Sequence, residues 1–302
     1  MIVDATLIKY MHYEYLRHLN AGGDKFPIAL APPSDRKGDA RARCSALNGC
    51  ATQSAFDRIG MDPTHPFLVS DFNYSKLLLF EEGRRSAEVW QEAFSFYCDS
   101  STISVEHEVD LSSTRLAGRC DSIFTDPSTG DRYIVELKRT EYGFNEKHAF
   151  QWAGYSLNSG AERGCIVAQS RKDSVIIECS YDKPLRMWVF SDDSDTKRVI
   201  FTVTEDELFK EISRHDSITS LVRSGGVPVT DDSQKIKYFC VKQRKPEEML
   251  PRVMKSGPDK GAVRDGHETP NCQYFGYCWG RFGNDYAVSH DDNGNLLYTE
   301  IE

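Results

Sequence analysis

Two apolar segments joined by a short polar turn set the tightest limit on how this chain can fold. The first covers residues 116–124 and the second residues 133–138, with a turn containing Pro and Gly between them. Such segments around such a turn are typical of a β-hairpin. Side chains two positions apart on a strand share a face, so Glu136 and Lys138 are expected to point the same way. The turn fixes the register, which allows Asp121 on the preceding strand to lie opposite them.

Two carboxylates beside a lysine suit a hard divalent cation. Mg²⁺ and Mn²⁺ prefer oxygen ligands, and the backbone carbonyl of Leu137 is a further candidate ligand between Glu136 and Lys138. Such a cation lowers the pKa of bound water and stabilises charge on a phosphate, and Lys138 would orient that water or help to deprotonate it. A surface salt-bridge ladder is the alternative, because a Glu-x-Lys triplet also arises by chance in a chain of this composition.

A helix is expected over residues 147–159, directly after the hairpin. Gln151 and Tyr155 are four positions apart, so a helix presents both on one face. They either belong to the hairpin site or, taken alone, place Tyr155 in the core and Gln151 in solvent.

The rest of the chain reads as a mixture of helices and strands. At 302 residues, 39% hydrophobic and 27% charged, the chain has the composition of an ordinary globular enzyme. Gly83 leaves open whether residues 74–96 form one kinked helix or two. Further helices are expected over residues 4–20 and 45–60 and after a capping box at residues 204–207. Strands are expected over 103–111, 165–168, 175–177 and 187–190.

Charge and hydropathy restrict the setting in which the protein works. The net charge of −9 argues against indiscriminate coating of nucleic acid, although local basic patches are compatible with it. No signal-peptide core is found in the first residues, and no apolar run approaches the roughly 20 residues that span a bilayer. We therefore expect a cytoplasmic protein without a membrane partner.

The hairpin and the following helix together carry three motifs in a fixed order: Gly118-x-x-Asp121, Glu136-x-Lys138 and Gln151-x-x-x-Tyr155. This set resembles the PD-(D/E)XK nuclease superfamily. More narrowly, it resembles the RecB-like exonuclease branch, which includes the CRISPR-associated RecB-family exonucleases and their phage-encoded relatives. The resemblance implies that Asp121 and Glu136 are metal ligands and that Lys138 is the catalytic lysine. Gln151 and Tyr155 would contact the DNA backbone or position the site.

The same resemblance, which covers mainly residues 45–160, implies an upstream metal ligand. In this branch it is usually His or Glu on a helix soon after a glycine, and here Gly83 and Glu88 match that pattern. Glu88 lies one residue further from the glycine than expected. Its alternative role is that of an ordinary exposed helix residue.

The implied fold is an α/β (α+β) restriction-endonuclease-like core, with a central mixed sheet flanked by helices. We expect a single nuclease domain over residues 1–302 with its core at about 74–222. The segments 1–73 and 223–302 would pack together as a subdomain that binds a metal cluster and guides DNA.

A cysteine-bound cluster is a second implication of the resemblance. Many relatives join the chain ends with a [4Fe–4S] cluster held by one N-terminal and three C-terminal cysteines. Thr269 occupies the position where one of these cysteines is expected, and His267 is a further candidate. Zn²⁺ is the alternative to iron–sulfur, because it tolerates Cys₃His ligation. The candidate ligands are Cys50, Cys240, Cys272 and Cys278.

The other cysteines lie in apolar or strand contexts and are expected to be buried small residues. They are Cys44, Cys98, Cys120, Cys165 and Cys179.

The motifs together favour a metal-dependent deoxyribonuclease that acts as an exonuclease on DNA ends or single strands in DNA processing, recombination or repair. Basic residues within 36–43 and 235–245 would contact phosphates, although the first segment is equally well read as a solvated connector. The alternatives are a DNA-binding or assembly subunit without turnover and a site-specific endonuclease. Protein partners would belong to a recombination or CRISPR-type assembly.

Overall fold

The computed structural model describes most of the chain up to residue 225 and six short strands beyond it. The chain divides into two compact units, Met1–Ser54 with Tyr74–Ser217 and Ala55–Asn73 with Ile218–Glu302. The first unit carries the sheet and every residue of the predicted hairpin site. The continuous described segments are 3–28, 42–60, 74–99, 101–109, 116–140, 143–170, 174–193 and 196–225.

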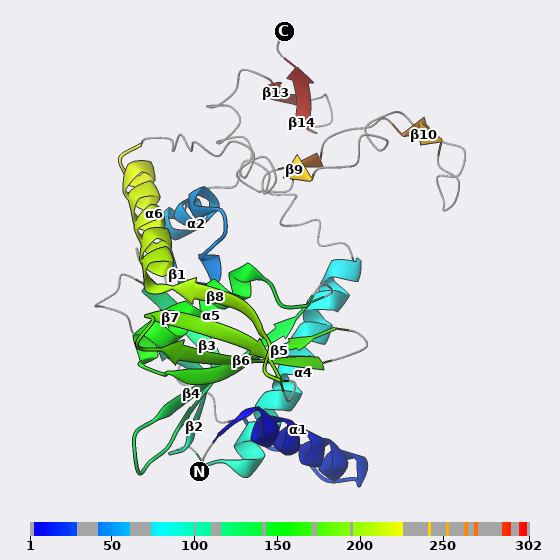
Figure 1. The fold of residues 1–302 in the computed structure, drawn as a ribbon. Coiled ribbons are helices and arrows are strands. Elements are labelled where there is room, and N and C mark those ends of the chain that lie inside the picture. The colour runs from blue at the N-terminus through cyan, green and yellow to red at the C-terminus, as the bar shows by residue number, and fades with distance from the viewer. Residues whose placement is uncertain are drawn as a thin grey trace. The chain divides into compact units, whose positions relative to one another are not determined.

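The first unit is built on a mixed eight-stranded sheet (Figure 1). The order is β1-β3-β4-β5-β6-β7-β8, and β2 also pairs with β3. The β1–β3 and β4–β5 pairs are parallel and the other pairs are antiparallel. The strands are β1 (Ala42–Arg43), β2 (Ile103–Val109), β3 (Leu116–Thr125), β4 (Arg132–Arg139), β5 (Arg163–Gln169), β6 (Ser174–Asp182), β7 (Met187–Asp192) and β8 (Val199–Thr204).

Helix α5 (Glu146–Ser159) connects the parallel strands β4 and β5. Parallel neighbours need such a crossover, so α5 runs opposite to β4. The helix begins at Asn145, whose side chain accepts from the His148 N–H while His148 Nδ1 accepts from the Asn145 N–H. It ends at Gly160, which has a φ of 72°, a conformation that a side chain disfavours.

Helices cover both faces of the sheet, so neighbouring residues of one strand pack into two different hydrophobic cores. Ile134 packs in a cluster with Trp152 of α5 and Leu208 of α6 (Glu205–Arg223). Its neighbour Val135 packs in a second cluster, with Trp90 of α4 (Tyr74–Tyr97) and residues of α1 (Ala5–Asn20). This alternation is the strand periodicity expected of a sheet buried on both sides.

Helix α4 is continuous across Gly83, so the single-helix alternative is correct. A Cβ placed on Gly83 would lie 3.4 Å from Cβ of Arg139, at the end of β4. Arg139 also pairs with Glu82 at 3.5 Å. Helix α4 therefore packs against the end of β4 that carries Lys138.

The second unit contains the end of α2 (Ala51–Ile59), the end of α6 and three short antiparallel pairs. Within it, Arg58 Nη1 donates to Thr219 Oγ1 at 2.8 Å. The pairs join β9 (Val241–Lys242) to β12 (Thr269–Pro270), β10 (Arg252–Val253) to β11 (Val263–Arg264), and β13 (Tyr286–His290) to β14 (Leu296–Glu300).

The sequence predicts the α/β class, the mixed sheet and its flanking helices correctly. The capping box is also confirmed, because the Glu207 N–H donates to Thr204 Oγ1 and the Thr204 N–H donates to Glu207 Oε2. Strand β8 was not predicted. It is an edge strand on which only Val203 is fully buried, so its apolar residues give no clear alternation.

The five cysteines expected in the core are all buried. Cys240, Cys272 and Cys278 and most of the two basic segments lie outside the described residues. None of the helices in the described part of the chain is long and apolar enough to cross a bilayer.

Candidate active site

Strands β3 and β4 stop pairing through their backbones where the predicted site begins. The register runs from Thr125 opposite Arg132 to Ser122 opposite Val135. Beyond the Ser122–Val135 pair, backbone N–H groups of the two strands donate to side-chain carboxylates instead of to backbone carbonyls. A parting of two strands within a sheet leaves room for side chains from both strands to converge.

Asp121 and Glu136 converge at this parting. The Leu137 N–H donates to Asp121 Oδ2 at 2.6 Å. In return, the Asp121 N–H donates to Glu136 Oε2 at 3.4 Å. The two carboxylates thus face each other across the hairpin, as the sequence predicts.

Glu136 is the buried centre of the group, with only 2% of its surface exposed. Its Oε1 accepts from Lys138 Nζ at 2.5 Å and from Gln151 Nε2 at 2.7 Å. A carboxylate with this little contact with water needs such charged and polar partners. The contact confirms that Glu136 and Lys138 share a face, and Lys138 stays partly open to solvent.

Gln151 and Tyr155 hold the site from helix α5. Both are buried, so the alternative that places Gln151 in solvent is wrong, and Tyr155 lies in the core. Gln151 Nε2 also donates to Tyr155 OH at 2.8 Å, and Tyr155 OH donates to the Arg119 carbonyl at 2.8 Å. Burial and the Glu136 charge raise the pKa of Tyr155 well above its ordinary value, so the hydroxyl stays protonated. Two helix residues thereby position one carboxylate and one strand carbonyl.

Small residues let helix α5 approach the hairpin this closely. A Cβ on Gly118 would lie 2.5 Å from Cε1 of Tyr155 and 3.0 Å from Sγ of Cys44. A Cβ on Gly154 of α5 would lie 3.1 Å from the same sulfur. The glycine of the Gly118-x-x-Asp121 motif is therefore required by packing.

Cys44 begins the 3-10 helix Cys44–Ala46 and lies buried beside the site. Burial, and after it the Glu136 charge, raise the pKa of its thiol. The pKa of the Cys120 thiol on β3 is raised in the same way, first by burial and then by the charge of Glu136. Both thiols therefore act as protonated packing groups at neutral pH rather than as thiolates.

The turn that follows Cys44 is fixed by helix α6. Glu211 accepts from the Asn48 N–H at 2.7 Å, and Arg214 donates to the Gly49 carbonyl at 2.7 Å. Burial alone would raise the pKa of Glu211, but hydrogen bonds from Arg214 and His215 lower it to about 2. These partners lie more than 150 residues apart, so no local motif predicts their contact.

The positive charge of Lys138 affects two basic residues in the first turn of α5. The desolvation of its ammonium, and then the charge of Lys138, lower the pKa of Lys147. Burial, followed by the charges of Lys138 and Lys147, lowers the pKa of His148 to about 4. His148 is therefore neutral at pH 7, and Lys138 and Lys147 carry the positive charge.

Glu88 lies on α4, where its carboxylate pairs with Arg84. One turn further on, Gln91 Nε2 lies 3.5 Å from the Asp121 carbonyl. Gln91 is thus an α4 residue that reaches the backbone of Asp121, a role that was not predicted from the sequence. Nothing distinguishes this glutamine in sequence except its spacing from Glu88.

Among the described residues, no three His, Cys, Asp or Glu side chains gather as a metal site. Glu88 therefore does not join Asp121 and Glu136 in this structure, and its role as a ligand stays a prediction, as does that of the Leu137 carbonyl. Two carboxylates remain, a number that suits Mg²⁺, which often takes one or two carboxylates and completes its shell with water and substrate phosphate.

The only described cysteine among the proposed cluster ligands is Cys50. Its Sγ accepts from the Gln53 N–H at 3.4 Å, at the start of α2. The helix expected over residues 45–60 begins only after Cys50, at Ala51. Its role as a cluster ligand stays a prediction.

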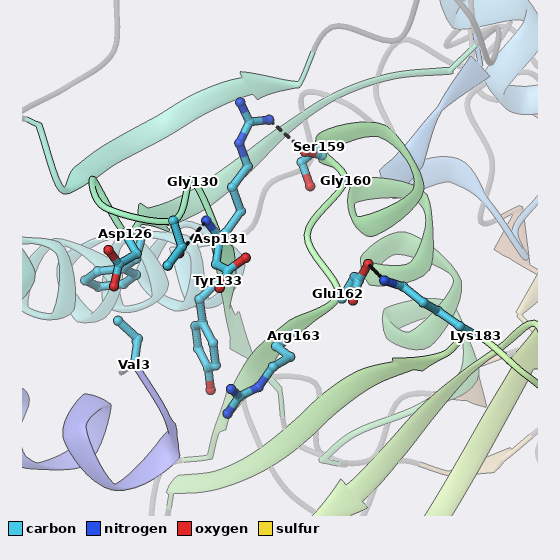
Figure 2. A pocket seen from close by; sticks show the side chains of 13 residues that line it. Val3, Asp126, Gly130, Asp131, Tyr133, Ser159, Gly160, Glu162, Arg163 and Lys183 are labelled. Carbon is cyan, nitrogen blue, oxygen red and sulfur yellow. Dashed lines mark hydrogen bonds and ion pairs between the residues drawn. The ribbon is translucent and has the colours of Figure 1, made fainter. Parts of the chain in front are cut away.

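A separate cavity of about 750 Å³ lies at the opposite end of β4 (Figure 2). Arg132 and Tyr133 line it at the start of the strand, whereas Glu136 and Lys138 lie toward its end. Figure 2 shows an ion pair between Glu162 and Lys183. Arg132 Nη1 donates to the Ser159 carbonyl at 2.7 Å. No residue of the candidate active site lines this cavity.

Comparison with known proteins places the chain in no family. No family model matches it, and no curated protein matches it. A solved structure described as "Crystal structure of SSO0001" is similar with a TM-score of 0.37 and 12% identity, covering 75% of this chain and 89% of that one. A similarity at that level carries no argument about fold or function.

Proposed function

We propose that the chain is a divalent-metal-dependent deoxyribonuclease with a PD-(D/E)XK core of the RecB-like type. The observation that carries the proposal is the convergence of Asp121, Glu136 and Lys138 where β3 and β4 part, with Glu136 held by Gln151. A surface salt-bridge ladder does not account for this arrangement, because Glu136 is 2% exposed. Burying a carboxylate costs free energy unless it is compensated, and such sites are frequently functional.

The residues present fit a hard cation. Asp121 and Glu136 offer carboxylate oxygens at one place, and Mg²⁺ or Mn²⁺ would be held there. When bound, such a cation would polarise the phosphate and lower the pKa of an attacking water.

The chain's own residues divide the remaining work. Lys138 places an ammonium beside Glu136, where it would offset charge on the phosphate and orient the water. Gln151 fixes the direction of the Glu136 carboxylate, and Tyr155 in turn fixes Gln151. The burial of Gln151 and Tyr155 favours this positioning role over direct contact with DNA.

The finer parts of the proposal follow the motif resemblance. The substrate would be DNA ends or single strands, and the reaction exonucleolytic hydrolysis of phosphodiester bonds. Cys50, Cys240, Cys272 and Cys278 would hold a [4Fe–4S] cluster. A DNA-binding subunit without turnover and a site-specific endonuclease are the outcomes against which this proposal is tested.

The test compares the wild type with Glu136→Gln on labelled linear single-stranded, linear duplex and closed circular DNA, with Mn²⁺ and with chelator. We expect Mn²⁺-dependent degradation of linear DNA by the wild type, and background levels with Glu136→Gln or chelator. The matched control is Glu178→Gln on β6. It removes a carboxylate that pairs with Lys197, and it should leave the rate unchanged.

Each other outcome has a distinct meaning. Salt-sensitive DNA binding without cleavage by the wild type would replace the nuclease with a binding subunit. Cutting of closed circles would establish an endonuclease. Equal cleavage by wild type and Glu136→Gln would remove the proposed site altogether.

A further inference from the structure

Lys147 extends the row of α5 residues that contact the candidate active site. Lys147, Gln151 and Tyr155 are spaced four apart and therefore follow one face of the helix. Tyr155 reaches the Arg119 carbonyl and Gln151 reaches Glu136. Because α5 runs opposite to β4, the next position toward the N-terminus of α5 lies toward the end of β4 that carries Lys138.

The spacing along α5 puts Lys147 on the side of the helix that carries Gln151 and Tyr155, and its side chain is exposed to solvent. The positive charge of Lys138 lowers the pKa of Lys147, after desolvation of the ammonium. The stem of Lys147 lies beside the turn at Gly49, where a Cβ would be 3.9 Å from the lysine Cε. The Arg214 hydrogen bond to the Gly49 carbonyl fixes that turn, so the Lys147 stem packs against an ordered segment of the backbone.

The position of Lys147 is unfavourable for the stability of the folded chain. The first turn of a helix carries partial positive charge, which disfavours a cation. The positive charge of Lys138 makes a second unfavourable contribution. Among the described residues, no carboxylate pairs with Lys147, and the adjacent Glu146 accepts from Asn48 Nδ2 at 3.2 Å. A local cost of this kind is expected at functional sites rather than at structural ones.

His148 offers Lys147 no anionic partner. Its Nδ1 accepts from the Asn145 N–H, which leaves the proton of the neutral ring on Nε2. Lys138 is already paired with Glu136, so Lys147 is the cation at this place that has no carboxylate partner among the described residues, and a substrate phosphate would supply that anion. A phosphodiester has the charge and the oxygen acceptors that two neighbouring lysines would bind.

We propose that Lys147 is a DNA-binding residue that contacts the phosphate next to the one that is cleaved. The inference rests on the proposed nuclease function and deepens it. It assigns to the first turn of α5 the task of holding the substrate strand in register, with Lys138 kept for the scissile phosphate.

The experiment compares Lys147→Gln and Lys147→Arg with the wild type. Cleavage of labelled single-stranded DNA with Mn²⁺ gives kcat and KM, and fluorescence anisotropy with Ca²⁺ over a series of salt concentrations gives Kd. The matched control is Lys183→Gln, which removes a lysine paired with Glu162 at the opposite end of the sheet. Far-UV circular dichroism checks that each variant is folded.

For Lys147→Gln we expect KM and Kd to rise about ten-fold with kcat little changed, as for loss of one charge-assisted phosphate contact. The slope of log Kd against log salt should fall by about one, and Lys147→Arg should restore most of the affinity. Lys183→Gln should match the wild type. Values for Lys147→Gln that equal those of Lys183→Gln, or a fall in kcat at constant KM, would overturn the inference.

Failure of the proposed function gives a different result. In that case the wild type cleaves no DNA with Mn²⁺, whatever residue stands at position 147. The Ca²⁺ binding series still decides whether Lys147 contacts DNA.

Discussion

Replacing Tyr155 with phenylalanine tests the link between helix α5 and the hairpin. The hydroxyl accepts from Gln151 Nε2 and donates to the Arg119 carbonyl, each at 2.8 Å, in a residue that is 2% exposed. The substitution keeps the ring that packs against Gly118 and removes only these two hydrogen bonds. At about 0.5–1.5 kcal/mol each, their loss should lower the free energy of unfolding by about 1–3 kcal/mol.

Urea unfolding followed by tryptophan fluorescence measures this loss. Trp90, Trp152 and Trp188 are all buried in the unit that carries the site, so their emission reports on its unfolding. With a urea dependence of roughly 3 kcal/mol per M, we expect the midpoint to fall by about 0.3–1 M.

Tyr97→Phe is the matched control, because that tyrosine is 40% exposed at the end of α4. Surface changes of this kind stay within about 0.5 kcal/mol. If Tyr155→Phe unfolds at the same urea concentration as Tyr97→Phe, the hydroxyl does not hold the Arg119 carbonyl and the proposed positioning role of Tyr155 is refuted.

Three further predictions concern packing, protonation and the cysteines. Gly118→Ala should destabilise the chain by about 1–3 kcal/mol through overpacking. Gly83→Ala in helix α4 should stabilise it by about 0.5–1 kcal/mol, because the added Cβ would meet Arg139 at an ordinary contact distance of 3.4 Å. Thermal melts that shift both variants in the same direction would contradict this. His148 should titrate by NMR near pH 4, and Lys138→Met should raise that pKa by removing a nearby positive charge. Because folding lowers this pKa from 6.5, protonation favours the unfolded chain. The contribution of His148 to stability is therefore complete above pH 6.5 and is lost as the pH falls toward 4. If Lys138→Met leaves the midpoint of the His148 NMR titration unchanged, the charge of Lys138 does not act on His148. Anaerobically purified protein should be brown and contain iron, and Cys272→Ala should lose both; a colourless protein that contains zinc would favour the Cys₃His alternative.

The sequence predicts the hairpin well because its information is local. The strand period places Glu136 and Lys138 on one face, and the turn brings Asp121 alongside, as the structure has them. The helix period likewise places Gln151 and Tyr155 together. The period leaves open which side of the helix faces the sheet, so it could not decide between a Gln151 in the site and the alternative of a Gln151 in solvent; the structure buries it.

Contacts between distant parts of the chain could not be read in the same way. The hydrogen bonds that Glu211 and Arg214 form with the turn at Asn48 join residues that are more than 150 positions apart. Neither the turn nor the helix segment carries a sequence motif that predicts this contact. On α4, spacing from Gly83 singles out Glu88, yet tertiary packing brings Gln91 to the Asp121 carbonyl. One turn of helix separates these two residues, and only the packing of α4 on the sheet decides between them.

The most direct test of the nuclease site is the rate at which the wild type and Lys138→Met hydrolyse a labelled linear single strand as Mn²⁺ is titrated. We expect the wild-type rate to rise from zero to saturation with Mn²⁺. Lys138→Met removes the ammonium beside Glu136 but keeps both carboxylates, so its rate should stay near background at every Mn²⁺ concentration. A wild type that never cleaves, or a Lys138→Met variant that reaches the wild-type rate, would contradict the assignment of this site.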